Sequence, residues 1–217
     1  MPSKPAPRPR CALYLITPPL LGADESRFAD SFAEILAATP FASALARIAG
    51  PAQGAAKTIL GPLTRIAAAA DCALLVENDP RLAARIGADG VHVGGVGDAL
   101  DEVVRSLKPE RIVGVGAVHT RHDAMTAGEK GADYVMFGEP RGASPSMPLD
   151  QLLDRVGWWS EIFETPCVAY ADSLEAATAL ARAGADFVAF DRIVWEADSP
   201  AEAARRIGAA IAQVEAR

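Results

Sequence analysis

The chain has few cysteines and a deficit of positive charge. Its three cysteines, Cys11, Cys72 and Cys167, are scattered and form no CxxC or other spacing typical of metal ligands. Because each lies within or at the start of an apolar run, we expect buried free thiols. The net charge is −7, from 21 basic and 28 acidic residues. A nucleic-acid-binding surface needs clustered basic residues, so the composition argues against a nucleic-acid partner.

Long apolar runs are also missing. No stretch approaches the roughly 18 uninterrupted apolar residues of a membrane-spanning helix, so we expect no membrane partner. The first ten residues, MPSKPAPRPR, are rich in proline and basic residues and lack the apolar centre of a signal peptide. They predict a disordered tail over residues 1–10 and a cytoplasmic location. Half of the 217 residues are hydrophobic, enough for one sizeable core, and we assign residues 11–217 to a single domain.

Short apolar runs alternate with helical patterns along that domain. Such runs predict strands at 11–16, 41–47, 72–77, 90–93, 111–118, 134–138, 167–171 and 187–190. Helical spacing predicts helices at 24–38, 55–70, 80–86, 98–107, 121–130, 149–164, 174–183 and 200–216. Eight strand-then-helix units favour a (β/α)8 TIM barrel, an α/β fold with a parallel sheet. An open doubly wound sheet is the rival, but the first strand is followed by LITPPLLG rather than by a GxGxxG loop.

One phrase, Gly-Ala-Asp, occurs three times, at 87–89, 131–133 and 184–186. Each copy lies where a predicted helix ends and a strand begins. Glycine suits the left-handed residue that ends a helix, and the aspartates then fall at the strand starts. Residues at that end of a barrel serve stability, so we favour a structural role over a catalytic set of three carboxylates.

Catalytic and binding residues of a TIM barrel follow the carboxyl ends of its strands. Asn78 and Asp79 end one apolar run: Asp79 can cap the helix that starts at Pro80, can hold Mg²⁺ against a diphosphate, or can do both. Near the last two strands, Ser173 and Arg192 predict a phosphate site, unless nearby aspartates repel the anion and pair with Arg192. The candidate site residues are Arg47, Asn78, Asp79, Asp98, His119, Arg141, Ser144, Ser173 and Arg192.

Several blocks resemble the thiamine-phosphate synthase family and its relative, the thiazole tautomerase TenI. They are LYLITP, NDPRLAARIGADGVHVGG, GVGAVHTRHDAMTAGEKGADYVMFGEP and AGADFVAFDRIVWEADSPAEAARRI, and the resemblance spans residues 11–207. It implies a barrel that joins a pyrimidine-methyl diphosphate to a thiazole phosphate and releases diphosphate with help from Mg²⁺. It also implies catalytic roles for Arg47 and Asp79, Mg²⁺ ligation by Asp79, and substrate binding by Asn78, Arg141 and Ser144, beside the phosphate site expected at Ser173 and Arg192. Asp98 is expected either to be a second Mg²⁺ ligand, if the loop GGVGD swings it inward, or to be only the N-cap of the helix that follows.

The chain departs from the family pattern at several of these positions. Leu45 and Ala49 stand where synthases carry the Gln and Lys of a Gln-x-Arg-x-Lys motif, of which Arg47 survives. Gly97 occupies the position of an expected acidic metal ligand, with Asp98 one residue later. The loop after the sixth strand has serines and Arg141 but no lysine, and Asp172-Ser173 replace a Gly-Gly pair. Much of the family's diphosphate clamp is therefore missing.

Two other functions stay open beside synthase activity. The resemblance to TenI places its functional histidine at His119, where an imidazole could move the proton that aromatises a thiazole phosphate. The second of these functions is the binding of a phosphorylated heterocycle without catalysis. His92, inside a strand, is expected to be structural. Trp158 and Trp159 predict packing or a subunit contact, which leaves a homo-oligomer open.

Overall fold

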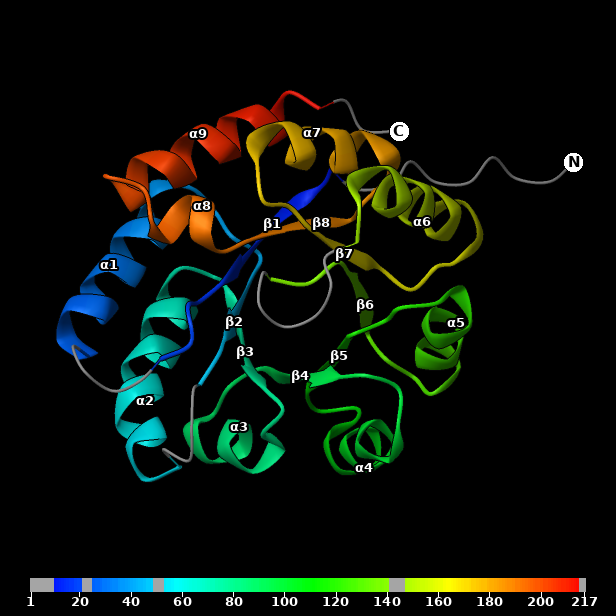
Figure 1. The fold of residues 1–217 in the computed structure, drawn as a ribbon. Coiled ribbons are helices and arrows are strands. Elements are labelled where there is room, and N and C mark those ends of the chain that lie inside the picture. Colours follow the sequence, from blue (N-terminus) through cyan, green and yellow to red (C-terminus); the bar gives the residue numbers. More distant parts are fainter. Residues whose placement is uncertain (1–9, 21–24, 49–52, 141–146, 215–217) are drawn as a thin grey trace, which may run out of the picture.

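Eight parallel strands close into a barrel in chain order, with helices around the outside (Figure 1). This computed structural model describes residues 10–20, 25–48, 53–140 and 147–214, so the tail predicted over residues 1–10 lies almost wholly outside it. The strands are β1 (Ala12–Ile16), β2 (Ser43–Ala46), β3 (Ala73–Glu77), β4 (Gly90–Gly94), β5 (Ile112–Gly116), β6 (Tyr134–Phe137), β7 (Cys167–Tyr170) and β8 (Phe187–Phe190).

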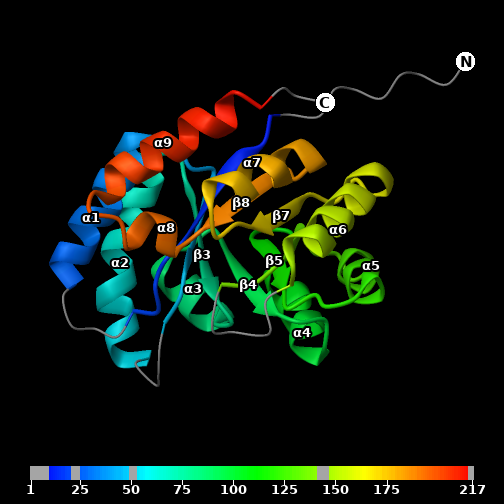
Figure 2. The same cartoon turned by 45° about the horizontal axis from the view of Figure 1, so that its top comes forward.

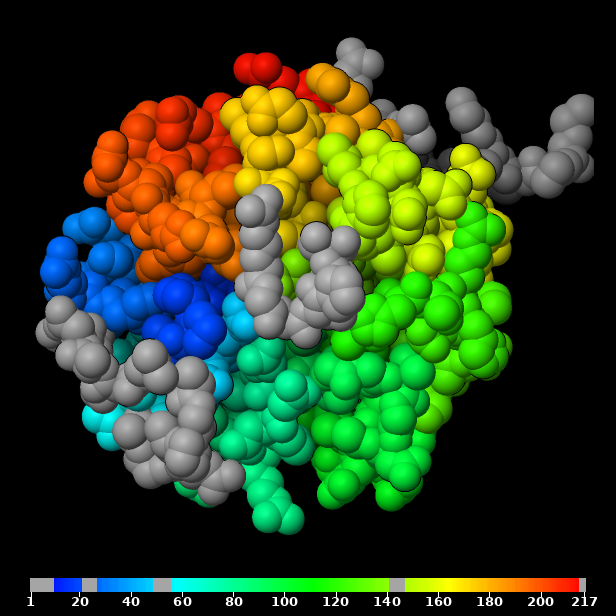
Figure 3. Space-filling view, in the orientation of Figure 1, coloured from blue at the N-terminus to red at the C-terminus, as the bar shows by residue number. Residues whose placement is uncertain are grey.

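The helices follow the strands around the circumference, as the turned view also shows (Figure 2). They are α1 (Glu25–Ala38), α2 (Gln53–Ala69), α3 (Pro80–Ile86), α4 (Asp98–Leu107), α5 (Arg121–Glu129), α6 (Leu149–Ile162), α7 (Leu174–Ala183), α8 (Arg192–Trp195) and α9 (Pro200–Ala212). In the space-filling view the coloured segments form a rim in chain order, from blue α1 through green α4 and α5 to red α9, which packs on α1 (Figure 3). The predicted single-domain (β/α)8 barrel is confirmed.

The differences from the predicted elements are local. The sequence did not predict α8, a helix of four residues after β8. β5 ends at Gly116 rather than at residue 118 because Ala117 has a positive φ of 51°, which turns the chain out of the strand. Gly97, and not Asp98, is the N-cap of α4, and Asp98 is the first helical residue.

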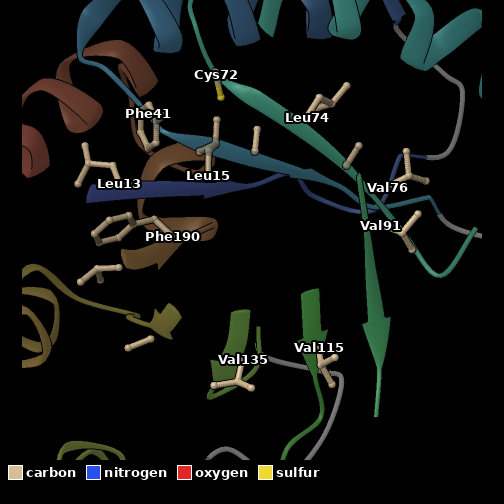
Figure 4. Close-up of a cluster of buried hydrophobic side chains, with 14 of the residues drawn as sticks. Leu13, Leu15, Phe41, Cys72, Leu74, Val76, Val91, Val115, Val135 and Phe190 are labelled. Atoms are coloured by element: carbon tan, nitrogen blue, oxygen red, sulfur yellow. The ribbon is translucent and has the colours of Figure 1, made fainter. Parts of the chain in front are cut away.

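The strands are buried on both faces, which explains their continuous apolar runs. Side chains on the outer face, such as Leu15, Leu74 and Phe190, pack against the helices in one large cluster (Figure 4). Alternate residues point inward to a smaller cluster that includes Ile16, Leu75 and Met136. The barrel interior is thus filled by side chains, and ligands have access only at its ends.

The Gly-Ala-Asp repeats have the structural role predicted for them. Gly87, Gly131 and Gly184 have φ of 71°, 89° and 108°, the left-handed region that glycine adopts without strain. Each aspartate then uses its carboxylate to accept a backbone N–H from the neighbouring strand, so the repeats tie adjacent strand starts together. Asp89 accepts from Leu74, Asp133 from Val113 and Asp186 from Cys167, each at 2.8 Å.

The cysteines are free thiols, as expected, with Cys72 and Cys167 buried and Cys11 partly buried. Burial raises the pKa of both Cys11 and Cys72 to about 12, so these thiols stay protonated and unreactive near neutrality. Within the described part of the chain, no helix is both long and apolar enough to cross a membrane.

Candidate active site

The residues that follow the strands all lie at one mouth of the barrel because all eight strands are parallel. Arg47, Asp79, His119 and Arg192 follow β2, β3, β5 and β8, so they share this mouth, as predicted. Their surroundings differ, however, and they do not form one cluster.

Arg47 directly follows β2, and its side chain is largely buried at the mouth. Its backbone N–H donates to the hydroxyl of buried Thr17 at 2.9 Å, which fixes the chain just after β2. Its guanidinium Nε lies 3.6 Å from a carboxylate oxygen of Glu77, with the two side chains 15% and 32% exposed. The Nε itself is buried and has no hydrogen-bond partner among the described residues. This geometry leaves Arg47 able to bind an anion that enters the mouth.

A chain of polar side chains crosses the barrel interior below that ion pair. The hydroxyl groups of Tyr14 and Tyr134 lie 2.8 Å apart, and the Tyr134 hydroxyl lies 2.8 Å from Nδ1 of His92. Burial is the main cause that lowers the pKa of His92, to about 4, and the positive charge of Arg47 lowers it further. His92 is therefore a neutral structural histidine near pH 7, consistent with the role expected for it.

Two glycines of β5 make room for these large side chains. A Cβ at Gly114 would lie 1.9 Å from the Tyr134 ring, and a Cβ at Gly116 would lie 2.4 Å from Nε2 of His92. Any side chain at either position would collide with the polar chain. The sequence GVG in β5 is thus required by residues far away along the chain.

Glu139 is a site residue that the sequence did not single out. It follows β6, and its carboxylate accepts the backbone N–H of Ala117 at the end of β5. Burial is the largest cause that raises its pKa, and Glu77 raises it too, while the Ala117 N–H, His119 and Arg47 act in the opposite direction. A carboxyl group perturbed by burial and by charged neighbours in a mouth is a candidate for function. Its only sequence signal was its position after a predicted strand.

The two residues after β3 have clear structural contacts. Asn78 adopts a φ of 54° and accepts the Gly94 N–H at 2.8 Å through its side-chain oxygen, which links the ends of β3 and β4. Asp79 caps α3 by accepting the Leu82 N–H at 2.8 Å through Oδ1. The predicted cap is confirmed, and it engages one oxygen of the carboxylate.

A dedicated metal centre is not preformed in the described part of the chain, where no group of three His, Cys, Asp or Glu side chains could hold an ion. Asp98 is exposed in the first turn of α4, which follows β4, the strand paired with β3. One carboxylate at the mouth and one exposed neighbour fit Mg²⁺, which keeps several waters and binds through one or two carboxylates together with substrate phosphates.

His119 is exposed, three residues beyond the end of β5. Its carbonyl oxygen accepts a long hydrogen bond of 3.4 Å from Arg155 of α6. Its imidazole is close enough to Glu139 to lower the pKa of that carboxyl group. His119 thus lies at the edge of the mouth beside a second titratable group.

The ends of β7 and β8 form a small cavity of about 230 Å³ lined by Tyr170, Asp172, Arg192, Ile193 and Glu196. Arg192 makes a bidentate pair with Glu196, at 2.7 and 2.9 Å, and its side chain is 55% exposed. Arg192 thus pairs with Glu196, the residue that directly follows its own short helix, α8 (Arg192–Trp195).

The Asp191 carboxylate and the Ser173 hydroxyl, near that cavity, both accept hydrogen bonds from neighbouring groups. The Asp191 carboxylate accepts both the Tyr170 hydroxyl, at 2.7 Å, and the Arg192 backbone N–H. Ser173 caps α7 by accepting the Ala176 N–H at 3.1 Å. Phosphate binding by Ser173 and Arg192 stays a prediction, as do the roles of Arg141 and Ser144, which lie outside the described residues.

The two tryptophans of α6 differ. Trp159 is fully buried, stacks on Phe163 and donates its indole N–H to the Thr165 carbonyl at 2.7 Å. Trp158 is half-buried, with the Arg121 guanidinium 4.7 Å from its ring centre. Trp159 therefore has the packing role expected, whereas Trp158 lies partly at the surface.

Comparison with known proteins agrees with this arrangement. The profile of the thiamine monophosphate synthase family matches residues 13–194. A thiamine-phosphate synthase of Rhodospirillum centenum is 40% identical over 189 residues, covering 85% of this chain and 89% of that protein. One from Hyphomonas neptunium is 37% identical over 212 residues, covering 94% and 95%.

Solved structures show the same fold at lower identity. A thiamine phosphate pyrophosphorylase from Pyrococcus furiosus superposes with a TM-score of 0.79 at 22% identity, covering 94% of this chain and 96% of that one. A 3-hexulose-6-phosphate synthase from Salmonella typhimurium gives 0.69 at 17% identity, covering 94% and 100%. The match of the family profile to most of the chain, together with the identity to curated relatives, shows that the chain belongs to the thiamine monophosphate synthase family.

Proposed function

We propose that this chain acts as a thiamine-phosphate synthase in thiamine biosynthesis. It would join a pyrimidine-methyl diphosphate to a thiazole phosphate and release diphosphate. The observation that carries the proposal is the extent of the likeness: 40% identity to a thiamine-phosphate synthase over 85% of the chain. The partners would be small phosphorylated heterocycles.

The residues at the mouth support this reaction in different ways. Arg47, whose buried Nε makes no hydrogen bond and lies 3.6 Å from the Glu77 carboxylate, would bind the departing diphosphate and stabilise the charge that develops on it. Asn78 links the ends of β3 and β4 and so fixes the position of Asp79. Holding both heterocycles above the filled barrel would bring the thiazole nitrogen next to the carbon that loses diphosphate.

Mg²⁺ is the proposed cofactor, held by Asp79 with Asp98 as a second ligand. When bound, the ion would neutralise negative charge on the diphosphate and so help it to leave. Because Asp79 uses Oδ1 for its cap, its other oxygen would face the ion. With so few protein ligands, the substrate phosphates would have to complete the coordination, and the free protein should bind Mg²⁺ weakly.

A TenI-like thiazole tautomerase is the second candidate, favoured by one observation. His119 follows β5 and Glu139 follows β6, and the two side chains could together remove a proton from one ring atom and return it to another. That reaction needs no diphosphate and no metal ion. Binding of a phosphorylated ligand without turnover is the remaining alternative.

We also propose a cytoplasmic location and a homo-oligomeric state. The second rests on the surface of α6, where half-buried Trp158 lies near Ile162, an apolar side chain that is 62% exposed. Sedimentation of the protein beside an Ile162→Lys variant would test it, since a dimer through α6 should dissociate in the variant.

The activity itself is tested by giving the protein both precursors with Mg²⁺ and measuring diphosphate release and the coupled product. A parallel reaction contains EDTA, and another measures aromatisation of a thiazole phosphate tautomer. We expect Mg²⁺-dependent release of one diphosphate per product formed. Aromatisation without diphosphate release would favour the tautomerase, and binding without either product would leave the non-catalytic barrel.

A further inference from the structure

The carboxylate of Glu139 accepts a backbone N–H at the mouth of the barrel. The backbone N–H of Ala117 ends β5 at the mouth, and Ala117 is held at a φ of 51° that few residues other than glycine adopt. Backbone N–H groups in turns can donate to phosphate oxygens. Here the acceptor is the carboxylate of Glu139, which follows the neighbouring strand β6.

The carboxyl group also borders the space left open by Gly116. Its Oε1 lies 3.2 Å from the point where a Gly116 Cβ would be, and Nε2 of His92 lies 2.4 Å from the same point. Glu139 therefore points toward the barrel axis and not into solvent. On the β7 side it lines a cavity of about 220 Å³ together with Tyr170 and Asp172.

Charged groups surround this carboxyl group from several elements. Arg47 after β2 and His119 after β5 favour its ionised form, while Glu77 at the end of β3 opposes it. From β4, His92 contributes a neutral ring at neutral pH because burial lowers its pKa to about 4. Arg47 is already within 3.6 Å of Glu77, so its charge is shared.

A phosphate group arriving at this mouth would meet an ionised Glu139 as a like charge at short range. In a partly buried site such a repulsion is large unless one group gains a proton. Burial already raises the pKa of Glu139, and the new negative charge would raise it further. Protonation would also turn the carboxyl group from an acceptor into an O–H donor.

We propose that Glu139 binds the phosphate groups of the substrate as a neutral carboxylic acid, taking up one proton from solvent as they bind and donating its O–H to a phosphate oxygen. No bond of the ligand breaks in this step: the added proton resides on Glu139 and leaves again with the anion. The inference rests on the proposed function to the extent that the ligand is a diphosphate. Glu139 is then a binding residue whose protonation state controls the affinity for the anion.

The test is calorimetric titration of the full chain with inorganic diphosphate and Mg²⁺, near neutral pH, in buffers of different ionisation enthalpy. The slope of the observed enthalpy against buffer enthalpy counts the protons taken up. Glu139→Gln keeps an oxygen for the Ala117 N–H and an N–H₂ donor for the ligand but cannot titrate. Glu161→Gln, at an exposed position of α6, is the matched control.

We expect wild type and the Glu161→Gln control to take up more protons per bound diphosphate than Glu139→Gln does. The difference should be at most one proton. We also expect the affinity of wild type to fall relative to Glu139→Gln as pH rises, approaching tenfold per pH unit for one linked proton. Equal proton uptake by wild type and Glu139→Gln would overturn the inference, as would failure of wild type to bind diphosphate. Binding with the expected uptake but without product formation would instead overturn the proposed function alone.

Discussion

Replacing Tyr134 by phenylalanine tests whether the polar chain inside the barrel stabilises the fold. The Tyr134 hydroxyl lies 2.8 Å from both the Tyr14 hydroxyl and Nδ1 of His92, and all three side chains are buried. Phenylalanine keeps the ring but leaves two buried polar groups without their partner. Each such group costs about 1–3 kcal/mol, so the free energy of unfolding should fall by roughly 2–6 kcal/mol.

The measurement is urea unfolding followed by circular dichroism, with Tyr14→Phe as the comparison. Tyr14→Phe breaks one of the two hydrogen bonds, so its loss should be about half as large, roughly 1–3 kcal/mol. Both variants should shift the midpoint without changing the denaturant slope, because the area exposed on unfolding hardly changes. A loss below about 0.5 kcal/mol for Tyr134→Phe would refute the reasoning, since that is the range of ordinary surface substitutions. Equal losses for the two variants would refute the linear order of the chain.

Three further changes have defined outcomes. The pKa of His92 is lowered from 6.5 to about 4, so between these pH values the unfolded chain binds a proton that the folded chain does not. The free energy of unfolding should therefore fall by up to about 3 kcal/mol as the pH drops from 6.5 to 4. In His92→Gln, unfolding measured at several pH values should show a free energy that depends less steeply on pH. Gly114→Ala places a Cβ 1.9 Å from the Tyr134 ring, so we expect a lower melting temperature by calorimetry, and an unchanged one would contradict the tight contact. Asp186→Ala removes the acceptor of the Cys167 N–H and should lower the free energy of unfolding by about 1–3 kcal/mol. Ligand affinity at the opposite mouth should stay as in wild type, and a loss of affinity would count against a purely structural role of Asp186.

The fold was predictable because each of its signals is local. Continuous apolar runs mark strands covered on both faces, and the Gly-Ala-Asp phrase marks three of the turns from helix to strand. The cap at Asp79 was likewise predictable from the proline that follows it. Such features depend on neighbours within a few residues.

The interior of the site was not predictable because it depends on contacts between distant segments. Tyr14 and Tyr134 are 120 residues apart, and nothing in either strand indicates that the two hydroxyl groups meet. The Glu139 carboxylate accepts the N–H of Ala117, and no local sequence pattern predicts the left-handed conformation of Ala117. Departures from the family's motif could be identified from the sequence, whereas the carboxyl group that now lies at the mouth needed the structure.

Asparagine in place of Asp79 provides the most direct test of the proposed activity. Asparagine caps a helix as well as aspartate does, so Asp79→Asn should preserve α3 and remove only the negative charge proposed to hold Mg²⁺. The measurement is Mg²⁺-dependent diphosphate release from the two thiamine precursors by wild type, Asp79→Asn and His119→Ala. We predict that Asp79→Asn abolishes release while its melting temperature stays that of wild type. Release by Asp79→Asn at the wild-type rate, or loss of turnover in His119→Ala alone, would contradict the synthase assignment.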